Sequence, residues 1–363
     1  MTFVCNRNFE MKKFSLNYFL LIALLIFSVG KKSVAQNSGQ QTFLSLTLPT
    51  SSHIAAVGGQ DLASWNKESA SFLQNPATLD LRSTNSFFLN YAPYIAGINT
   101  TAFGFSHSFH KLGNFGFGMQ YLDYGVFEKT DETGFDLGKS FFGKDFSSVV
   151  GYSNKLTEHI NYGVSAKYIY SAFESYSAAA IALDAGLIFE DTTSAISAGL
   201  CLKNAGTVFN DFTSNSESKL PFDLQAGINK QLKHTPFTLC LNLHDLTKFD
   251  IRYPENTQDI LVIDSTDYKE KKYVADKVLR HCNFAIQINA GKNLEMNVGY
   301  NHQRRKELEY DIRKSLSGFS FGFRLLVKKI NLGYSYSIFN ISGGQSNLSL
   351  SFHLPDFVSV RKM

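Results

Sequence analysis

From residue 84 onward, large apolar residues alternate with small or polar ones. Between residues 319 and 325, Phe and Leu occupy the odd positions, whereas Ser, Gly and Arg occupy the even ones. A period of two is that of a β-strand with one apolar face. The alternation recurs along the chain and predicts fourteen strands. They are expected at 84–92, 100–109, 114–124, 145–153, 161–172, 177–189, 194–204, 220–231, 236–250, 281–290, 294–303, 316–327, 330–339 and 347–354.

The connections between these strands alternate in length. All the long connections fall at every second position along the chain, while the connections between them are short. The alternate connections that include the long ones are 93–99, 125–144, 173–176, 205–219, 251–280, 304–315 and 340–346. Outer-membrane barrels have long external loops and short periplasmic turns, and an even strand number returns both ends to the periplasm. The sequence therefore predicts an all-β fold, a membrane-spanning antiparallel β-barrel of about fourteen strands over residues 84–354.

The two faces of the strands decide between a barrel and a soluble sandwich. In a soluble protein the outward face is usually rich in charge. Here the second face is mostly Gly, Ser, Ala and Asn. Such a face suits the interior of a transmembrane barrel, with Phe, Leu and Tyr turned toward lipid. A secreted β-sandwich is the alternative.

The first 35 residues have the pattern of a secretory signal peptide. A charged stretch begins at Met11, which we expect to be the true start, and an apolar run and a small-x-small site precede Gln36. A retained membrane helix is the alternative, because the apolar run is near the lower limit of about 17 residues. At the other end, we expect residues 355–363 to form a tail beyond the last strand. The signal for assembly of the barrel into the membrane is then expected inside the chain, at 350–354.

Residues 36–83 precede the first strand and are too numerous for a simple connection. Within them, 55–79 combines a Gly pair, which can form a tight turn, with an Asn-Pro turn that ends a helix. We expect this stretch to fold inside the barrel as a hatch, with Asn75 binding backbone groups of the wall. An ordinary surface helix and turn is the alternative. The hatch residues are Gly58, Gly59, Asn75, Pro76 and Ala77.

Composition adds little chemistry to this picture. Charged residues make up 18% of the chain and the net charge is +4, which indicates no nucleic-acid partner. Nucleophile, metal and redox motifs are missing, so no catalytic site, metal site or cofactor is predicted. His53, His107, His244 and His281 are expected to be lumen or interface residues. Cys201 and Cys240 are expected to be inert thiols, because their strands are not adjacent.

The chain resembles the FadL-like family of outer-membrane barrels in its Ala-Val-Gly-Gly stretch at 56–59 and its Asn-Pro-Ala turn. It is also similar to the PorQ-like proteins of the type IX secretion system. The stretches that carry this second resemblance are 86–97 (SFFLNYAPYIAG), 116–133 (GFGMQYLDYGVFEKTDET), 220–229 (LPFDLQAGIN), 277–281 (KVLRH) and 299–308 (GYNHQRRKEL).

The second resemblance implies a part of a secretion machine in the outer membrane of a Bacteroidetes-type bacterium. Such a barrel holds a PorZ-like surface protein in an attachment complex with PorU-like and PorV-like proteins. The complex joins secreted cargo to lipopolysaccharide. The alternative is a FadL-like channel for hydrophobic small molecules, which would need an apolar lumen pocket. An outer-membrane enzyme is a third possibility, for which no set of titratable groups can be assembled.

Charged residues in three predicted external loops are the candidates for partner docking, because binding residues concentrate on loops carried by rigid scaffolds. The cationic ones could also contact lipopolysaccharide phosphates. A solvated loop surface is the alternative for each loop. The candidate residues are Glu128, Lys129, Asp131, Glu132, Lys269, Lys271, Lys272, Arg304 and Arg305.

Overall fold

The computed structural model describes residues 42–64, 68–109, 111–214, 217–252, 274–308, 316–327, 329–340 and 343–354. The predicted signal peptide at 1–35 and the tail at 355–363 lie outside these residues. Most of the predicted loop 251–280 does too, including Lys269, Lys271 and Lys272.

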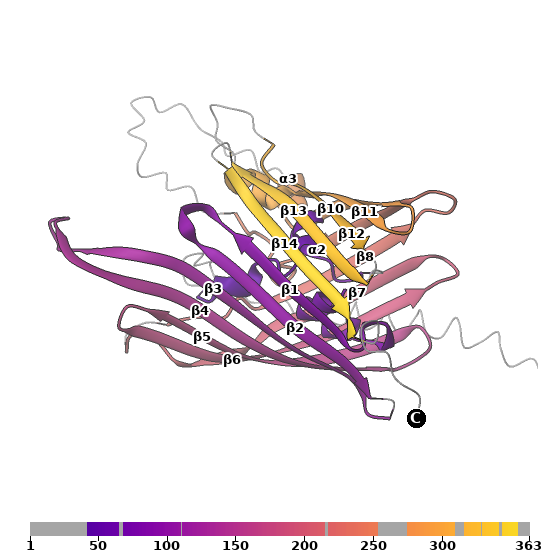
Figure 1. Cartoon of the computed structure of the whole chain (residues 1–363), viewed down its shortest axis with the longest axis horizontal. Coiled ribbons are helices and arrows are strands. Elements are labelled where there is room, and N and C mark those ends of the chain that lie inside the picture. The colour runs from indigo at the N-terminus through magenta and orange to yellow at the C-terminus, as the bar shows by residue number, and fades with distance from the viewer. Residues whose placement is uncertain are drawn as a thin grey trace, which may run out of the picture. The chain divides into compact units, whose positions relative to one another are not determined.

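Fourteen antiparallel strands form a closed barrel (Figure 1). Each strand pairs with its neighbours in sequence, and β1 also pairs with β14, so the sheet has no free edge. The strands are β1 (Ser86–Pro93), β2 (Asn99–Phe109), β3 (Gly113–Thr130), β4 (Asp136–Lys155), β5 (Ile160–Phe173), β6 (Tyr176–Asp191), β7 (Ile196–Asn210), β8 (Asp223–Gln231), β9 (Phe237–Leu243), β10 (Cys282–Ala290), β11 (Leu294–Asn301), β12 (Phe319–Val327), β13 (Ile330–Asn340) and β14 (Gly343–His353).

The two faces of the sheet have the predicted orientation. Phe321 on β12 is 42% exposed on the outside, whereas its neighbour Ser320 is fully buried inside. Large apolar side chains cover the outer wall, and Gly, Ser and Asn line the interior. The predicted all-β barrel of fourteen strands is therefore confirmed. Among the described residues, no helix is long and apolar enough to span a membrane.

The predicted loop at 125–144 is wrong, because β3 and β4 continue through most of it. After a bulge between Asp123 and Val126 the two strands pair again, and the rings of Phe127 and Phe141 stack with centroids 5.2 Å apart. This cross-strand packing stabilises the extension. Only residues 131–135 form the turn, and Figure 1 shows the hairpin extending beyond its neighbours.

Two other predicted loops contain short helices, which are α3 (Val274–Arg280) and α4 (His302–Leu308). They contact each other at the end of the barrel that carries the long loops. The strand predicted at 236–250 ends earlier, at Leu243. The connection between β1 and β2 contains η5 (Ile95–Gly97).

The N-terminal segment 42–83, without 65–67, lies against the inner wall of the barrel. It forms η1 (Leu44–Thr47), α2 (Ser52–Ala56), η2 (Ser69–Leu73), η3 (Pro76–Thr78) and η4 (Leu81–Ser83). Helix α2 contacts β11 to β14, and η3 contacts β4 to β6 on the other side. We call this segment the hatch.

Candidate functional site: the hatch and the lumen

After η1, the hatch forms the short helix α2, which ends in a glycine turn. The Ser51 hydroxyl accepts a hydrogen bond of 3.3 Å from the Ile54 N–H and caps α2. Gly58 and Gly59 follow with φ angles of 97° and 105°. These angles favour glycine, because a side chain would strain the backbone. The wall holds the turn through Asn301, whose Nδ2 donates to the Gly58 carbonyl at 3.1 Å.

The second part of the hatch is organised by Asn75, which is fully buried. Its Oδ1 accepts from the Ala77 N–H at 3.1 Å and caps the short helix that Pro76 begins. Its Nδ2 donates to the carbonyl of Leu62 at 3.0 Å and to that of Leu187, on β6, at 3.3 Å. One amide thus joins two parts of the hatch to the barrel wall.

Two wall glycines allow this close approach. A side chain at Gly163 would overlap the backbone of Pro76 and Ala77, and one at Gly186 would overlap the amide of Asn75. The small residues on the inner face of β5 and β6 therefore match the Asn-Pro-Ala turn in shape. This match gives the inward-facing glycines of the sequence a structural role.

A buried charge network joins the hatch to the wall. The His53 ring contacts two carboxylates, with Nε2 2.9 Å from Asp61 and Nδ1 3.1 Å from Glu295 on β11. Glu295 also accepts from Arg324 on β12 at 2.6 Å. Burial lowers the pKa of His53, but the hydrogen bonds and charges of Asp61 and Glu295 outweigh it and raise this pKa to about 10. His53 is therefore a buried cation at neutral pH.

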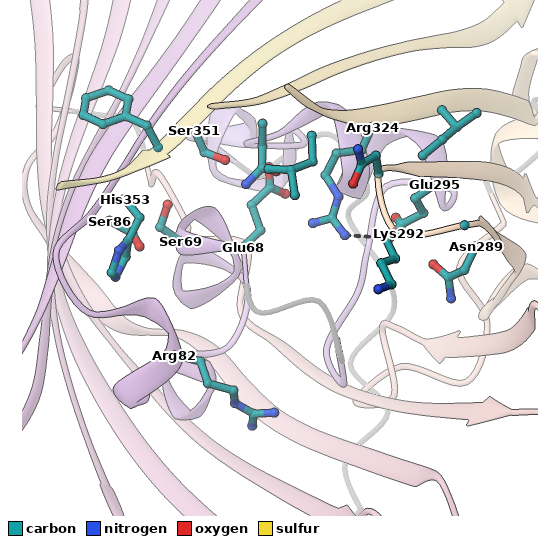
Figure 2. A pocket seen from close by; sticks show the side chains of 16 residues that line it. Glu68, Ser69, Arg82, Ser86, Asn289, Lys292, Glu295, Arg324, Ser351 and His353 are labelled. Carbon is teal, nitrogen blue, oxygen red and sulfur yellow. Dashed lines mark hydrogen bonds and ion pairs between the residues drawn. The ribbon is translucent and has the colours of Figure 1, made fainter. Parts of the chain in front are cut away.

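Two polar cavities lie on either side of this network. The turn-side cavity, of about 520 Å³, lies beside the hatch near the short turns. Figure 2 shows Arg82, Lys292, Arg324, Glu68 and Glu295 around it. The loop-side cavity, of about 370 Å³, lies between the hatch and α4 and is also lined mainly by polar and charged side chains.

The apolar part of the lumen is filled by the chain itself. Phe43 and Leu46, at η1, pack with Ile169 and the alanines of β6 into one buried cluster. Val208 and Leu220 cover the edge of this cluster. Sequence reasoning missed this contact, although the alternation in the stretch FLSLTL at 43–48 was a signal that could have found it.

The candidate docking residues do not come together. Glu128 and Lys129 lie on β3, where Lys129 forms an ion pair with Glu174. Asp131 is in the hairpin turn with Glu132, and hydrogen bonds from the Thr133 hydroxyl and nearby N–H groups lower the pKa of its exposed carboxyl.

The two arginines predicted to lie in a loop are both on α4. Arg304 turns inward and lines the loop-side cavity. Its guanidinium donates to the Ser320 hydroxyl at 3.3 Å and lies 4.9 Å from the ring centre of Phe339. Burial lowers the pKa of Arg304 to about 10.

The thiols and histidines of the described residues form no metal cluster. Cys201, Cys240 and Cys282 are buried and unpaired with one another. His244 and His281 are close, with ring centroids 6.3 Å apart, but each bonds a neighbouring carbonyl or carboxylate. His107 lies on the outer wall between Phe105 and Phe109.

No protein-family model and no curated protein matches this sequence. Solved structures with a similar fold do exist. The Pseudomonas putida toluene transporter TodX matches over 85% of this chain and 99% of its own, with a TM-score of 0.52 and 12% identity. A second TodX structure matches over 84% and 96%, with a TM-score of 0.50 and 12% identity.

A Pseudomonas aeruginosa homologue of FadL gives a TM-score of 0.44 at 9% identity, over 85% of this chain and 98% of its own, which is too low to carry an argument. At these identities the likeness establishes the fold and not the activity. The chain thus has the barrel fold of the solved TodX structures.

Proposed function

We propose that this protein is a plugged outer-membrane barrel that anchors a surface protein at its loop end. The observation that carries the proposal is the filled lumen. The hatch is bonded to the wall through Asn75 and Asn301 and through the buried charges around His53. A barrel closed in this way is suited to presenting a rigid external face.

The partner follows from the sequence resemblance to PorQ-like proteins. It is a PorZ-like surface protein, held in an attachment complex with PorU-like and PorV-like proteins that joins cargo to lipopolysaccharide. In this proposal the chain is the membrane component of a type IX secretion system. Its barrel has no catalytic part in cargo attachment.

Helices α3 and α4 offer a platform for such a partner. Asp276 bonds Arg280 at 2.9 Å and His302 of α4 at 3.1 Å, so the two helices are linked. On this linked platform Val274 and Val278 are 60% and 50% exposed. They are four residues apart and so lie on one helix face. Exposed apolar side chains of this kind mark interaction surfaces when they cluster outside the membrane.

A channel for hydrophobic small molecules is the second candidate, and the fold comparison favours it more directly than the anchor. TodX is a toluene transporter. The apolar cluster around Ile169 would provide a site for such a molecule if Phe43 and Leu46 left it. The present filling of that site, and the polar lining of both cavities, favour the anchor.

Pull-down from outer membranes distinguishes the anchor from the channel. The tagged barrel should recover a surface protein, and Val278→Asp should abolish the recovery. Leu156→Asp is the matched control, because Leu156 is 64% exposed at the opposite end of the barrel. Recovery of no surface protein, together with barrel-dependent uptake of toluene by cells, would favour the channel.

A further inference from the structure

Leucine stands beside an exposed lysine in three short turns at the end of the barrel opposite the long loops. These turns join β2 to β3, β4 to β5 and β8 to β9. The leucines of the first two are each 64% exposed, and all three lysines are exposed. Turns favour Gly, Pro, Asn, Asp and Ser, so the recurrence of leucine requires an explanation. The pairs are Lys111 with Leu112, Lys155 with Leu156, and Lys233 with Leu232.

The apolar outer wall of the barrel continues up to these turns. Phe109 and Phe115 flank the turn that carries Leu112, are 47% and 37% exposed, and pack edge to face with ring centroids 5.6 Å apart. Phe115 also packs against Tyr152 of β4 at 5.2 Å, so the row of aromatic rings extends toward the next turn. In outer-membrane barrels such aromatic girdles lie at the membrane interfaces. The exposed leucines therefore lie directly beside an interfacial girdle.

Cations are spread around this end of the barrel. Lys111, Lys155 and Lys233 belong to turns at different places around the closed sheet. Exposed lysines also occur in the turns that follow β10 and β12, at Lys292 and Lys329. Within the described ranges, Lys111, Lys155 and Lys233 have no carboxylate partner. Their ammonium groups keep three donors each for a ligand outside the chain.

Few carboxylates on this rim compete for the lysines. Glu190 forms an ion pair with Arg82 at 2.7 Å. Asp191 accepts hydrogen bonds from the N–H groups of Thr193 and Ser194 and so closes its own turn. Glu158 is an exposed acidic residue in the turn after β4. The five exposed lysines of the turns outnumber these acidic groups, so the rim presents mainly positive charge.

Leucine and lysine at the same turns fit a lipid surface. Exposed leucine gains free energy by entering the boundary between headgroups and acyl chains. The stem of a neighbouring lysine can follow the apolar side of this boundary while its ammonium group stays among the headgroups, where it donates to phosphate. A zwitterionic phospholipid carries its own cation, so the lysines favour an anionic one. A soluble acidic protein would have to reach three separated turns, whereas the membrane surrounds all of them.

We propose that the turn end of the barrel binds the headgroups of anionic phospholipids in the leaflet around it. Leu112 and Leu156 enter the apolar boundary of that leaflet, and Lys111, Lys155 and Lys233 donate to the phosphates. The contact fixes the depth at which the barrel sits in the membrane. This inference goes beyond the proposed anchor and does not depend on a surface partner.

Electron spin resonance of spin-labelled lipids tests the proposal on the full-length barrel. The protein is reconstituted in phosphatidylcholine vesicles that contain a trace of spin-labelled phosphatidylglycerol or of spin-labelled phosphatidylcholine. The fraction of label immobilised at the barrel gives the relative affinity for the two lipids. The wild type should prefer phosphatidylglycerol about threefold or more. This preference should fall as salt rises, because salt screens exposed charges.

Two triple variants with the same change in net charge locate the preference. The first combines Lys111→Gln, Lys155→Gln and Lys233→Gln and should lose most of the preference for phosphatidylglycerol. The control changes three exposed lysines toward the loop end and should keep the wild-type preference. It combines Lys139→Gln, Lys144→Gln and Lys306→Gln. Heat-modifiable gel migration checks that both barrels assemble.

A tryptophan placed in one turn measures where the leucines lie. Leu112→Trp is made together with Trp65→Phe, which removes the single tryptophan of the chain. Its fluorescence should be quenched by lipids brominated near the headgroup end of their acyl chains, and only weakly by acrylamide in the water. Val278→Trp in the same background is the matched control. It should show the reverse, because Val278 is 50% exposed on α3 at the loop end.

The proposal is overturned by any of three results. Equal affinity of the wild type for the two lipids would mean that the turn lysines are only solvated. Equal loss of the preference in both triple variants would assign it to net charge alone. Quenching of Leu112→Trp by acrylamide and not by brominated lipid would place the turns in water, where a soluble acidic protein would be the ligand to seek.

Discussion

Asp61→Asn tests the buried charge network that holds the hatch. The substitution keeps the shape of the side chain and its bond with Asn229, but removes one of the two carboxylates that face His53. A rise in the pKa of His53 from 6.5 to about 10 corresponds to about 5 kcal/mol of stabilisation of the buried cation. Removing one of the two carboxylates leaves the buried cation only partly compensated, so the cost should be about 3 kcal/mol, at the lower end for breaking a buried ion pair.

Hydrogen–deuterium exchange of peptides covering 52–64, followed by mass spectrometry at pH 7, measures the loss. A cost of about 3 kcal/mol raises the opening equilibrium of the hatch on the order of a hundredfold. Glu174→Gln is the control, because its ion pair with Lys129 lies at the exposed hairpin and is worth less than about 1 kcal/mol. If Asp61→Asn and Glu174→Gln left hatch exchange equally slow, the charge network would have no part in holding the hatch.

Three further predictions concern pH, the outer wall and the loops. The raised pKa of His53 contributes stability that is complete below pH 6.5 and is lost as pH rises through about 10, so hatch exchange corrected for its intrinsic rate should accelerate across this window; a flat profile would contradict the assignment of His53 as a cation. Phe321→Arg on the outer wall should cost roughly 2–4 kcal/mol and impair assembly into membranes, measured by heat-modifiable gel migration, whereas Ser320→Ala inside should be far milder; the reverse order would exchange the two faces. Replacing 256–274, most of which lies outside the described residues, by a short Gly/Ser linker should release the surface partner in a pull-down while the barrel still assembles, and capture by the wild type should slow as salt rises; full retention of the partner would move the docking face to another loop.

The strands could be predicted because the alternation of side chains along each strand reflects the two environments that its two faces meet. Alternation is local, so residues 330–339 predict β13 without reference to any other part of the chain. The extension of β3 and β4 was missed because charged residues such as Glu128 interrupt the apolar alternation there. Its stability comes from the pairing of Phe127 with Phe141 across the hairpin, which a single strand does not show.

The hatch was predicted by its glycine and Asn-Pro turns, but its contacts could not be. His53 meets Glu295 across 242 positions of the sequence. Arg304 was expected to be a docking residue in an external loop because its neighbours are charged, yet it lies on α4 and turns inward to line the loop-side cavity. Such contacts depend on how the barrel closes, which sets the distance between strands far apart in the chain.

The conductance of single barrels in planar lipid bilayers tests most directly whether the lumen is plugged. The wild-type protein should conduct poorly, because the hatch fills the lumen between the two cavities. A variant lacking 55–79, checked for barrel assembly by heat-modifiable migration, should conduct ions at least several-fold better. An assembled variant with unchanged conductance would mean that this stretch does not close the barrel, and the plugged anchor would then be the wrong account of the protein.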